Sequence, residues 1–198
     1  MEIFSDTAIV LRNIKYKDRD LIIVCLTQSH GKITAIVKNA INARRFGGSL
    51  DFLACSKMQF VHKPHSEMAR IDESVTHFEF SKLQNDFERF TTASFVAEFC
   101  LKLLEERVPT NEMYALLSNA LFYLNSGADL KEAFNAFLVK AFKIMGYAPS
   151  LLRCVSCNKP AHELLDNAPK LSQSLYFWSS RGGGMVCISC AGSAYPES

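Results

Sequence analysis

Four cysteines in the last quarter of the chain have the type and spacing of a metal site. Cys154 and Cys157 form one Cys-x-x-Cys pair, and Cys187 and Cys190 form a second pair after 29 intervening residues. Such a turn directs two thiolates to one metal ion, and four thiolates complete the tetrahedral coordination of zinc. Because four protein ligands leave no open coordination position, the sequence predicts one structural zinc ion. A redox role for a single pair is the alternative, and the second pair disfavours it.

The residues between the two pairs fit a small metal module. Residues 176–178 (Tyr-Phe-Trp) predict a strand, and the glycines at 182–184 predict a turn into the second pair. His162 could replace one cysteine, but four thiolates already complete the site. Zinc binding of about 10 kcal/mol is comparable with the whole stability of a small domain. Removal of the metal is therefore expected to unfold residues 150–198.

Other catalytic chemistry finds little support in the sequence. No serine or cysteine stands in a recognisable context with a histidine and an acid, and no Gly-Lys-Ser/Thr follows the glycine triplet as a phosphate loop requires. Cys25, Cys55 and Cys100 lie in apolar segments, where a free cysteine behaves as a small hydrophobic residue. We therefore expect no catalytic residue and predict that the protein is not an enzyme.

Basic residues are concentrated in the first third of the chain. Between Arg12 and Lys63 there are ten basic and three acidic residues, so this window carries +7 whereas the whole chain carries +2. Many of the cations fall in predicted loops, where they could follow a phosphate backbone, with Tyr16 and Phe46 available to stack on bases. A solvated basic face without a ligand is the alternative. The predicted DNA contacts are Arg12, Lys15, Lys17, Arg19, Lys32, Lys38, Arg44 and Arg45.

The elements that must position these residues change type along the chain. Residues 7–11, 21–27, 33–37, 57–61 and 74–78 are short runs of β-branched and aromatic residues separated by turn-formers. Five such strands predict a small closed barrel, with an open sandwich as the alternative. Gly31 is expected to supply the positive φ of a hairpin turn between the second and third strands.

From about residue 81 the apolar pattern has the period of helices. Three amphipathic helices are predicted, with Pro109-Thr110 opening the second, Gly127 closing it, and Asp129 with Glu132 forming a capping box for the third. Their apolar stripes are interpreted as core. The predicted fold is α+β, with a barrel over residues 1–80, a helical domain over 81–149 and a four-cysteine zinc module over 150–198.

The sequence shows no export signal and no membrane-spanning segment. An acidic residue follows Met1 where a signal peptide needs basic ones, and the apolar run at residues 21–26 is far shorter than the roughly 20 residues of a membrane helix. We expect a cytoplasmic protein.

The order of several motifs resembles the RecO family of bacterial DNA-repair mediators. The resemblance rests on residues 9–12 (Ile-Val-Leu-Arg), 16–20 (Tyr-Lys-Asp-Arg-Asp), 27–32 (Thr-Gln-Ser-His-Gly-Lys), Lys38, 45–50 (Arg-Phe-Gly-Gly-Ser-Leu) and 146–149 (Gly-Tyr-Ala-Pro). It implies an oligonucleotide-binding (OB) barrel, a helical domain and a zinc module, in a nucleoid-associated protein.

The resemblance also implies a function without turnover. Members of this family bind single- and double-stranded DNA, anneal complementary strands, and help RecA to load on DNA coated by single-strand-binding protein (SSB). The implied partners are therefore DNA, RecR and the acidic C-terminal tail of SSB, which would dock on the helical domain. A zinc-containing interaction adaptor without direct DNA binding is the alternative function.

Overall fold

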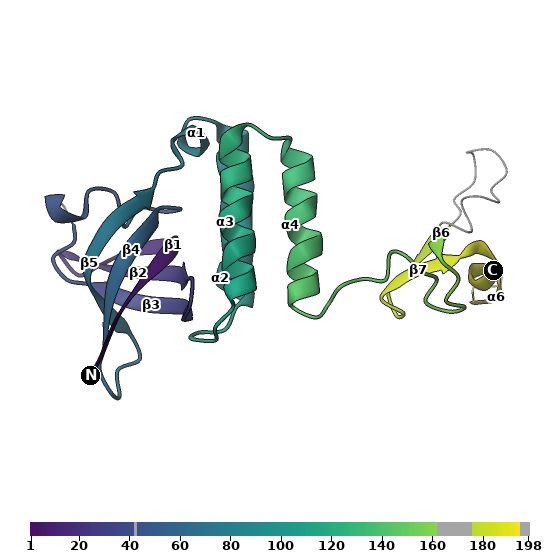
Figure 1. The fold of residues 1–198 in the computed structure, drawn as a ribbon, viewed down its shortest axis with the longest axis horizontal. Coiled ribbons are helices and arrows are strands. Elements are labelled where there is room, and N and C mark those ends of the chain that lie inside the picture. The colour runs from purple at the N-terminus through teal and green to yellow at the C-terminus, as the bar shows by residue number, and fades with distance from the viewer. Residues whose placement is uncertain (42, 162–175, 195–198) are drawn as a thin grey trace. The chain divides into compact units, whose positions relative to one another are not determined.

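The computed structural model describes residues 1–41, 43–161 and 176–194, and it divides into two compact units. The first unit spans Met1–Ala141 and the second spans Phe142–Ser198. Strands precede helices in the first unit (Figure 1), so the α+β class is confirmed. The finer division at residues 80 and 149 stays a prediction.

The N-terminal strands close into a barrel (Figure 1). The order around the barrel is β1-β2-β3-β5-β4, and β3 and β5 are the parallel pair. In β3, every second residue is buried, as expected for a strand with one face in the core. The predicted five-stranded barrel is confirmed, and the open sandwich is wrong. The bounds are β1 Glu2–Tyr16, β2 Asp20–Thr27, β3 Gly31–Val37, β4 Cys55–His62 and β5 Ala69–Phe78.

The strand β1 is much longer than its apolar run. A bulge between Val10 and Arg12 shifts its register against β2, after which the pairing continues to Tyr16 opposite Asp20. The residues from Arg12 to Tyr16 are exposed, so this end of the β1–β2 hairpin carries polar side chains beyond the barrel core. Hydrophobic periodicity could not predict this extension, because backbone pairing alone maintains it.

Between β3 and β4 the chain folds back over the barrel. The loop of residues 38–54 contains one short 3₁₀ helix, η1 (Arg44–Phe46), and Gly47 follows it with a positive φ of 45°. Phe46 and Leu50 are buried among the barrel core residues. These two anchors hold the loop against the barrel.

The chain continues from the barrel into the helices α1 Ser81–Gln84, α2 Phe87–Leu103, α3 Asn111–Ser126 and α4 Leu130–Ile144. The expected end signals for the later helices are confirmed. The Asp129 carboxylate accepts the Glu132 amide at 2.9 Å, and Gly127 ends α3 with φ at 100°. The short helix α1 carries no apolar repeat, which is why the pattern did not predict it.

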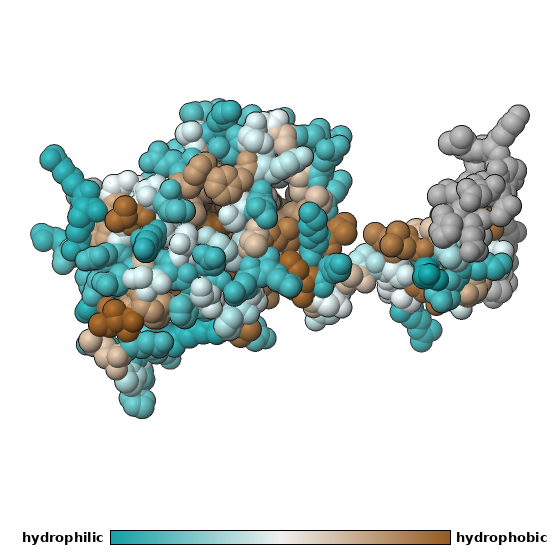
Figure 2. All heavy atoms as spheres, viewed as in Figure 1, coloured by the Kyte–Doolittle hydropathy of each residue, from teal (hydrophilic) through white to brown (hydrophobic). Residues whose placement is uncertain are grey.

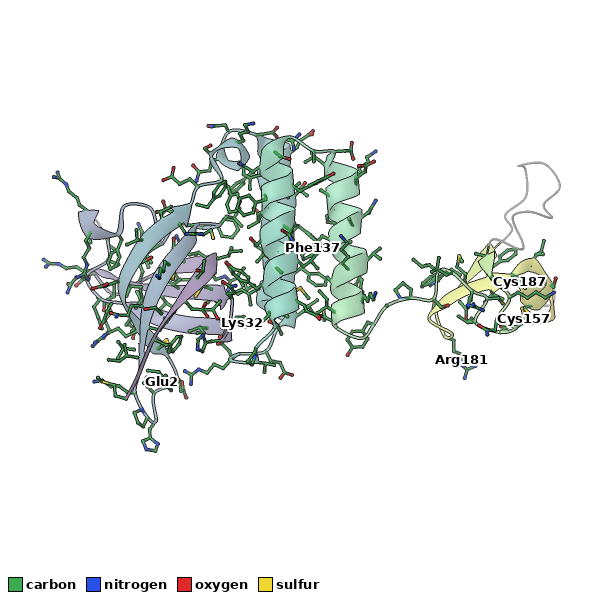
Figure 3. All side chains as sticks on the ribbon, in the orientation of Figure 1. Glu2, Lys32, Phe137, Cys157, Arg181 and Cys187 are labelled. Atoms are coloured by element: carbon green, nitrogen blue, oxygen red, sulfur yellow. The ribbon has the colours of Figure 1, made fainter. Side chains whose placement is uncertain are left out.

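The helices bury the predicted stripes in α3 and α4 more completely than in α2. Leu117, Leu121 and Phe137 are almost fully buried, and Phe137 lies between α3 and α4 (Figure 3). In α2, however, Phe95 and Leu103 are 46% and 48% exposed. The buried face of α2 is made by the smaller side chains of Ala93, Val96, Ala97 and Cys100.

A loop from the helical region completes one end of the barrel. Glu106 in the α2–α3 loop (residues 104–110) forms a parallel bridge with Lys32, and the Arg107 amide donates to the Lys32 carbonyl at 2.8 Å. Gly31, with φ at 74°, lies against Val108 so closely that a Cβ would stand 2.6 Å from the Val108 carbonyl carbon. The predicted hairpin glycine therefore also permits the barrel to contact the helices.

The second unit contains the hairpin of β6 (Tyr176–Ser179) and β7 (Gly184–Cys187), followed by α6 (Ile188–Ala194). Trp178 pairs with Met185 across the hairpin, so the predicted strand and glycine turn are confirmed. The segment around Ser150 lies along the other side of β7, with the Met185 amide donating to the Ser150 carbonyl at 2.9 Å. The hairpin thus has a chain segment on its free edge.

Candidate metal centre and nucleic-acid interface

The four predicted cysteines converge in the second unit. The sulfur atoms of Cys154, Cys157, Cys187 and Cys190 all lie within 4.8 Å of one another. Cys157 and Cys187, which Figure 3 labels, have their sulfurs 3.7 Å apart. A tetrahedral zinc ion with bonds of about 2.3 Å would place its sulfurs about 3.8 Å apart. The cluster therefore has the ligands and the dimensions to hold one metal ion.

Local backbone structure aims these thiols. Cys154 and Cys157 lie in a turn in which the Asn158 amide donates to the Cys154 carbonyl at 2.9 Å. Cys187 ends β7, and Cys190 lies one turn into α6. At Gly184 a Cβ would lie 2.6 Å from the Ser150 carbonyl oxygen, so only glycine allows the segment around Ser150 to pack on the hairpin. The glycine of the predicted turn therefore also has a packing role.

The four thiols strongly influence one another's protonation. Burial raises the pKa of Cys154, but the backbone amides of Cys187, Cys157 and Ser156 outweigh it and lower the pKa to about 6. The neighbouring thiols of Cys187 and Cys157, together with burial, raise the pKa of Cys190 to about 12. Four thiolates in this space repel one another, and a divalent cation compensates them. His162, which the sequence offered only as a possible replacement for one cysteine, lies outside the described residues.

The other three cysteines are buried, as predicted. Burial raises the pKa of the Cys25 thiol far above its ordinary value, and it raises the pKa of Cys100 to about 12. Burial also raises the pKa of Cys55, although a hydrogen bond with Tyr114 partly opposes the shift. These three thiols stay protonated and unreactive.

Most of the predicted DNA contacts lie at one end of the barrel, on the β1–β2 hairpin end and the loop after β3. Asp20 joins these two segments, because its carboxylate accepts hydrogen bonds from the Lys38 ammonium at 2.7 Å and from the Asn39 amide at 2.9 Å. The Ile41 amide also donates to the Arg19 carbonyl at 3.0 Å. We call the six cations on these segments the basic loop surface: Lys15, Lys17, Arg19, Lys38, Arg44 and Arg45.

The side chains of the basic loop surface are partly ordered by one another. Arg45 donates to the Lys38 carbonyl at 3.1 Å, and its guanidinium lies 4.5 Å from the centre of the Phe46 ring. Phe46 is only 5% exposed, so the expectation that it stacks on bases is wrong; it anchors the loop in the core. Tyr16 is 38% exposed beside Lys17 and remains accessible.

The other two predicted contacts face the helices. Lys32 donates to the Leu101 carbonyl at 2.8 Å, in the last turn of α2. Arg12 lies near Glu98 of α2, and Lys102 together with Arg12 lowers the pKa of the Glu98 carboxyl. The structure therefore does not bring Arg12 and Lys32 together with the other six.

Asp20 is the residue of this surface that sequence reasoning missed. Lys38 and the Asn39 amide hold the pKa of its carboxyl below the ordinary value. In the sequence it is only one of the few acids in a basic window. An acid at the end of a hairpin, between two basic segments, was the available signal.

Comparisons with known proteins agree with this architecture. The family model described as Recombination protein O N terminal matches residues 1–80, and the model described as Recombination protein O C terminal matches residues 84–194. The chain belongs to the RecO family. It is therefore a DNA repair and recombination protein by family, as the motif order predicted.

Individual RecO relatives align along most of the chain. The DNA repair protein RecO of Desulfatibacillum aliphaticivorans is 31% identical over 94% of this chain and 70% of its own length. The RecO proteins of Syntrophus aciditrophicus and Rhodopirellula baltica are 29% and 27% identical, over 91% and 92% of this chain. This chain covers 67% and 65% of those two relatives, or about two thirds of their length. Among the described helices, none is long and apolar enough to cross a bilayer.

Proposed function

We propose that this chain binds DNA through the basic loop surface and acts as a non-enzymatic recombination mediator. The observation that carries the proposal is the joining of two basic segments by Asp20, with bonds of 2.7 Å to Lys38 and 2.9 Å to the Asn39 amide. Pairing with Lys38 also compensates the charge of Asp20. Of the remaining groups in the β1–β2 turn, only Asp18 is acidic, so the cations of this surface outnumber the acids that oppose their attraction of phosphates.

The chemistry of this surface suits contacts with the DNA backbone. Arginine and lysine side chains bind phosphates without reading base sequence. The accessible ring of Tyr16 offers a stacking platform for an unpaired base, which suits single-stranded DNA. Neutralising the phosphates of two strands at once lowers their repulsion. This supports the annealing of complementary strands. We also propose, on the basis of family membership, that the chain helps RecA to load on SSB-coated DNA together with RecR.

The acidic C-terminal tail of SSB is proposed to dock in a groove between α3 and α4. The groove has a volume of about 330 Å³, and its walls include Leu116, Tyr123 and Phe137. Lys140 supplies a positive charge at the groove, although Glu132 also lines it. An anionic peptide with an apolar end matches these walls. Lys140→Glu should weaken binding of the tail peptide and leave DNA binding unchanged.

For the metal centre we propose one zinc ion held by all four cysteines. Soft thiolates select zinc over calcium or magnesium, and a full set of protein ligands leaves no position for a substrate. The ion would then stabilise the second unit and take no part in chemistry. Metal analysis of the purified protein should give one zinc per chain, and loss of metal in a Cys157→Ser, Cys190→Ser variant should accompany its unfolding.

A salt titration tests DNA binding. Contact with about five phosphates of a single strand gives a log-log slope of affinity against salt of roughly −3.5. Arg44→Glu with Arg45→Glu should weaken binding to all sequences and flatten this slope. Lys82→Glu with Lys131→Glu changes the same amount of charge on two exposed helical lysines and is the matched control.

The result also separates the mediator from the adaptor. Equally weakened DNA binding in both double variants would show that only net charge matters. It would reject the basic loop surface as the DNA-binding site. An absence of DNA binding at low salt, together with partner capture that survives high salt, would favour the adaptor. Strand annealing with and without SSB then measures the mediator activity itself.

A further inference from the structure

A large cavity lies where the barrel meets the helices of the first unit. Its volume is about 530 Å³, and five segments form its walls: Asn13 of β1, residues 48–54 of the β3–β4 loop, the end of β5, α1, and the start of α2. Figure 2 shows apolar side chains gathered below α1, between the barrel and the helices. Cavities at such junctions are common ligand sites. The proposed DNA and zinc sites do not use it.

Aromatic rings provide much of the apolar wall. Phe52 and Phe90 meet edge to face with their centres 5.9 Å apart. Phe78 packs against Phe80 at 5.0 Å and against Phe122 at 4.3 Å, which fixes its ring. Of the cavity residues, Phe90 is 37% exposed. Ring faces in such a wall attract cations through their quadrupole.

Among the described residues that line the cavity, all the charge is negative: Asp51 and Glu79 line it, and none of the described lining residues is a lysine, arginine or histidine. In the part of the chain that the structure describes, neither carboxylate takes part in a salt bridge or a side-chain hydrogen bond. Asn13 donates through Nδ2 to the Leu50 carbonyl at 3.2 Å, which leaves its Oδ1 as an acceptor. The cavity therefore offers aromatic faces and hydrogen-bond acceptors to a cationic donor.

We infer that this cavity binds an arginine side chain of a partner protein. A guanidinium is planar, stacks on aromatic rings, and donates five hydrogen bonds in a fork that suits two separate carboxylates. Its three-carbon stem fits the apolar wall. DNA does not suit the cavity, because phosphates would meet Asp51 and Glu79. Lysine carries a compact, strongly hydrated charge that cannot stack in the same way, so it fits less well.

The position of the cavity adds a functional consequence. One wall is the end of the β3–β4 loop, and the middle of the same loop carries Arg44 and Arg45. Between them, the Ser49 amide donates to the Phe46 carbonyl at 2.8 Å, and the Asp51 amide donates to the Gly48 carbonyl at 3.0 Å. A single ordered loop thus connects the basic loop surface with an acidic cavity. A partner arginine would bind beside the DNA without competing for it.

Amide NMR spectra of the full chain, titrated with Nα-acetyl-arginine amide, test the inference. We expect saturable shifts confined to the cavity residues, namely residue 13, residues 48–54, residues 76–84 and residue 90. Nα-acetyl-citrulline amide has the same shape without the charge and should bind roughly 3- to 30-fold more weakly, as two exposed carboxylate contacts imply. The Asp51→Asn, Glu79→Gln variant should lose this discrimination.

The control variant is Glu73→Gln, Glu112→Gln, which removes the same charge from two exposed positions that do not line the cavity. It should bind the arginine amide as the unchanged protein does. Equal shifts with the arginine and citrulline probes, or shifts spread over the whole surface, would overturn the inference. So would unaltered arginine binding in the Asp51→Asn, Glu79→Gln variant, with its fold verified by circular dichroism.

Discussion

The contact between Gly31 and the α2–α3 loop makes a quantitative prediction for Gly31→Ala. Alanine at φ near 74° bears the strain of the left-handed region, about 1 to 2 kcal/mol. The new Cβ would also lie 2.6 Å from the Val108 carbonyl carbon, so the loop or the strand must shift. Such overpacking costs about 1 to 3 kcal/mol. We therefore expect the free energy of unfolding of the first unit to fall by about 2 to 5 kcal/mol.

Gly127→Ala is the matched control. Gly127 has φ at 100°, but a Cβ there has no neighbour within 4 Å, so only the strain remains. Urea unfolding followed by far-UV circular dichroism reports mainly on α2, α3 and α4, whereas the single tryptophan, Trp178, reports on the second unit. Gly31→Ala should lower the urea midpoint of the dichroism transition more than Gly127→Ala does. It should leave the midpoint of the Trp178 transition unchanged. Equal losses in the two variants would refute the contact argument.

Three further predictions concern the metal centre, the contact between Lys32 and α2, and the basic loop surface. Chelation of the metal should change Trp178 emission and unfold the second unit, while most of the helical dichroism remains. Lys32→Met should destabilise the first unit by about 1 to 2 kcal/mol, because the Leu101 carbonyl loses a charged hydrogen-bond donor. Salt titrations of DNA binding should give the same slope for this variant as for the unchanged protein. Because the folded-state pKa of Asp20 lies below its ordinary value of 3.8, the stability it contributes is present above that pH and is lost as the pH falls below it. Asp20→Asn should therefore flatten the acid limb of a pH titration of stability.

The metal centre was predictable because its signal is local. Two Cys-x-x-Cys pairs specify the ligands through the geometry of single turns, so tertiary structure had only to bring two turns together. The barrel strands and the later helices were predictable for a similar reason, since β-branched runs and apolar repeats mark the buried face of each element. The capping pair of Asp129 and Glu132 and the C-terminal Gly127 are equally local signals.

The basic surface was less predictable, because charge in a sequence window does not show direction. Lys32 and Arg12 belong to the same basic window as Arg44, yet they face α2. Their partners, such as the Leu101 carbonyl, come from helices some 70 residues further along the chain. Only the fold distinguishes a lysine near a helix end from one that faces solvent. Phe46 was misjudged for the same reason, because its burial depends on the barrel core.

The cavity under α1 was invisible to sequence patterns for a different reason. Its walls come from five segments that are contiguous only after the barrel has closed on the helices, and its two carboxylates, Asp51 and Glu79, stand alone in their local sequence. In the sequence, Asp51 only reduced the net positive charge of the basic window. Yet a mediator must hold DNA and a protein partner at once, and one sign of charge cannot attract both a phosphate backbone and an arginine. Opposite charges on two parts of one loop meet that requirement, because each part excludes the ligand of the other.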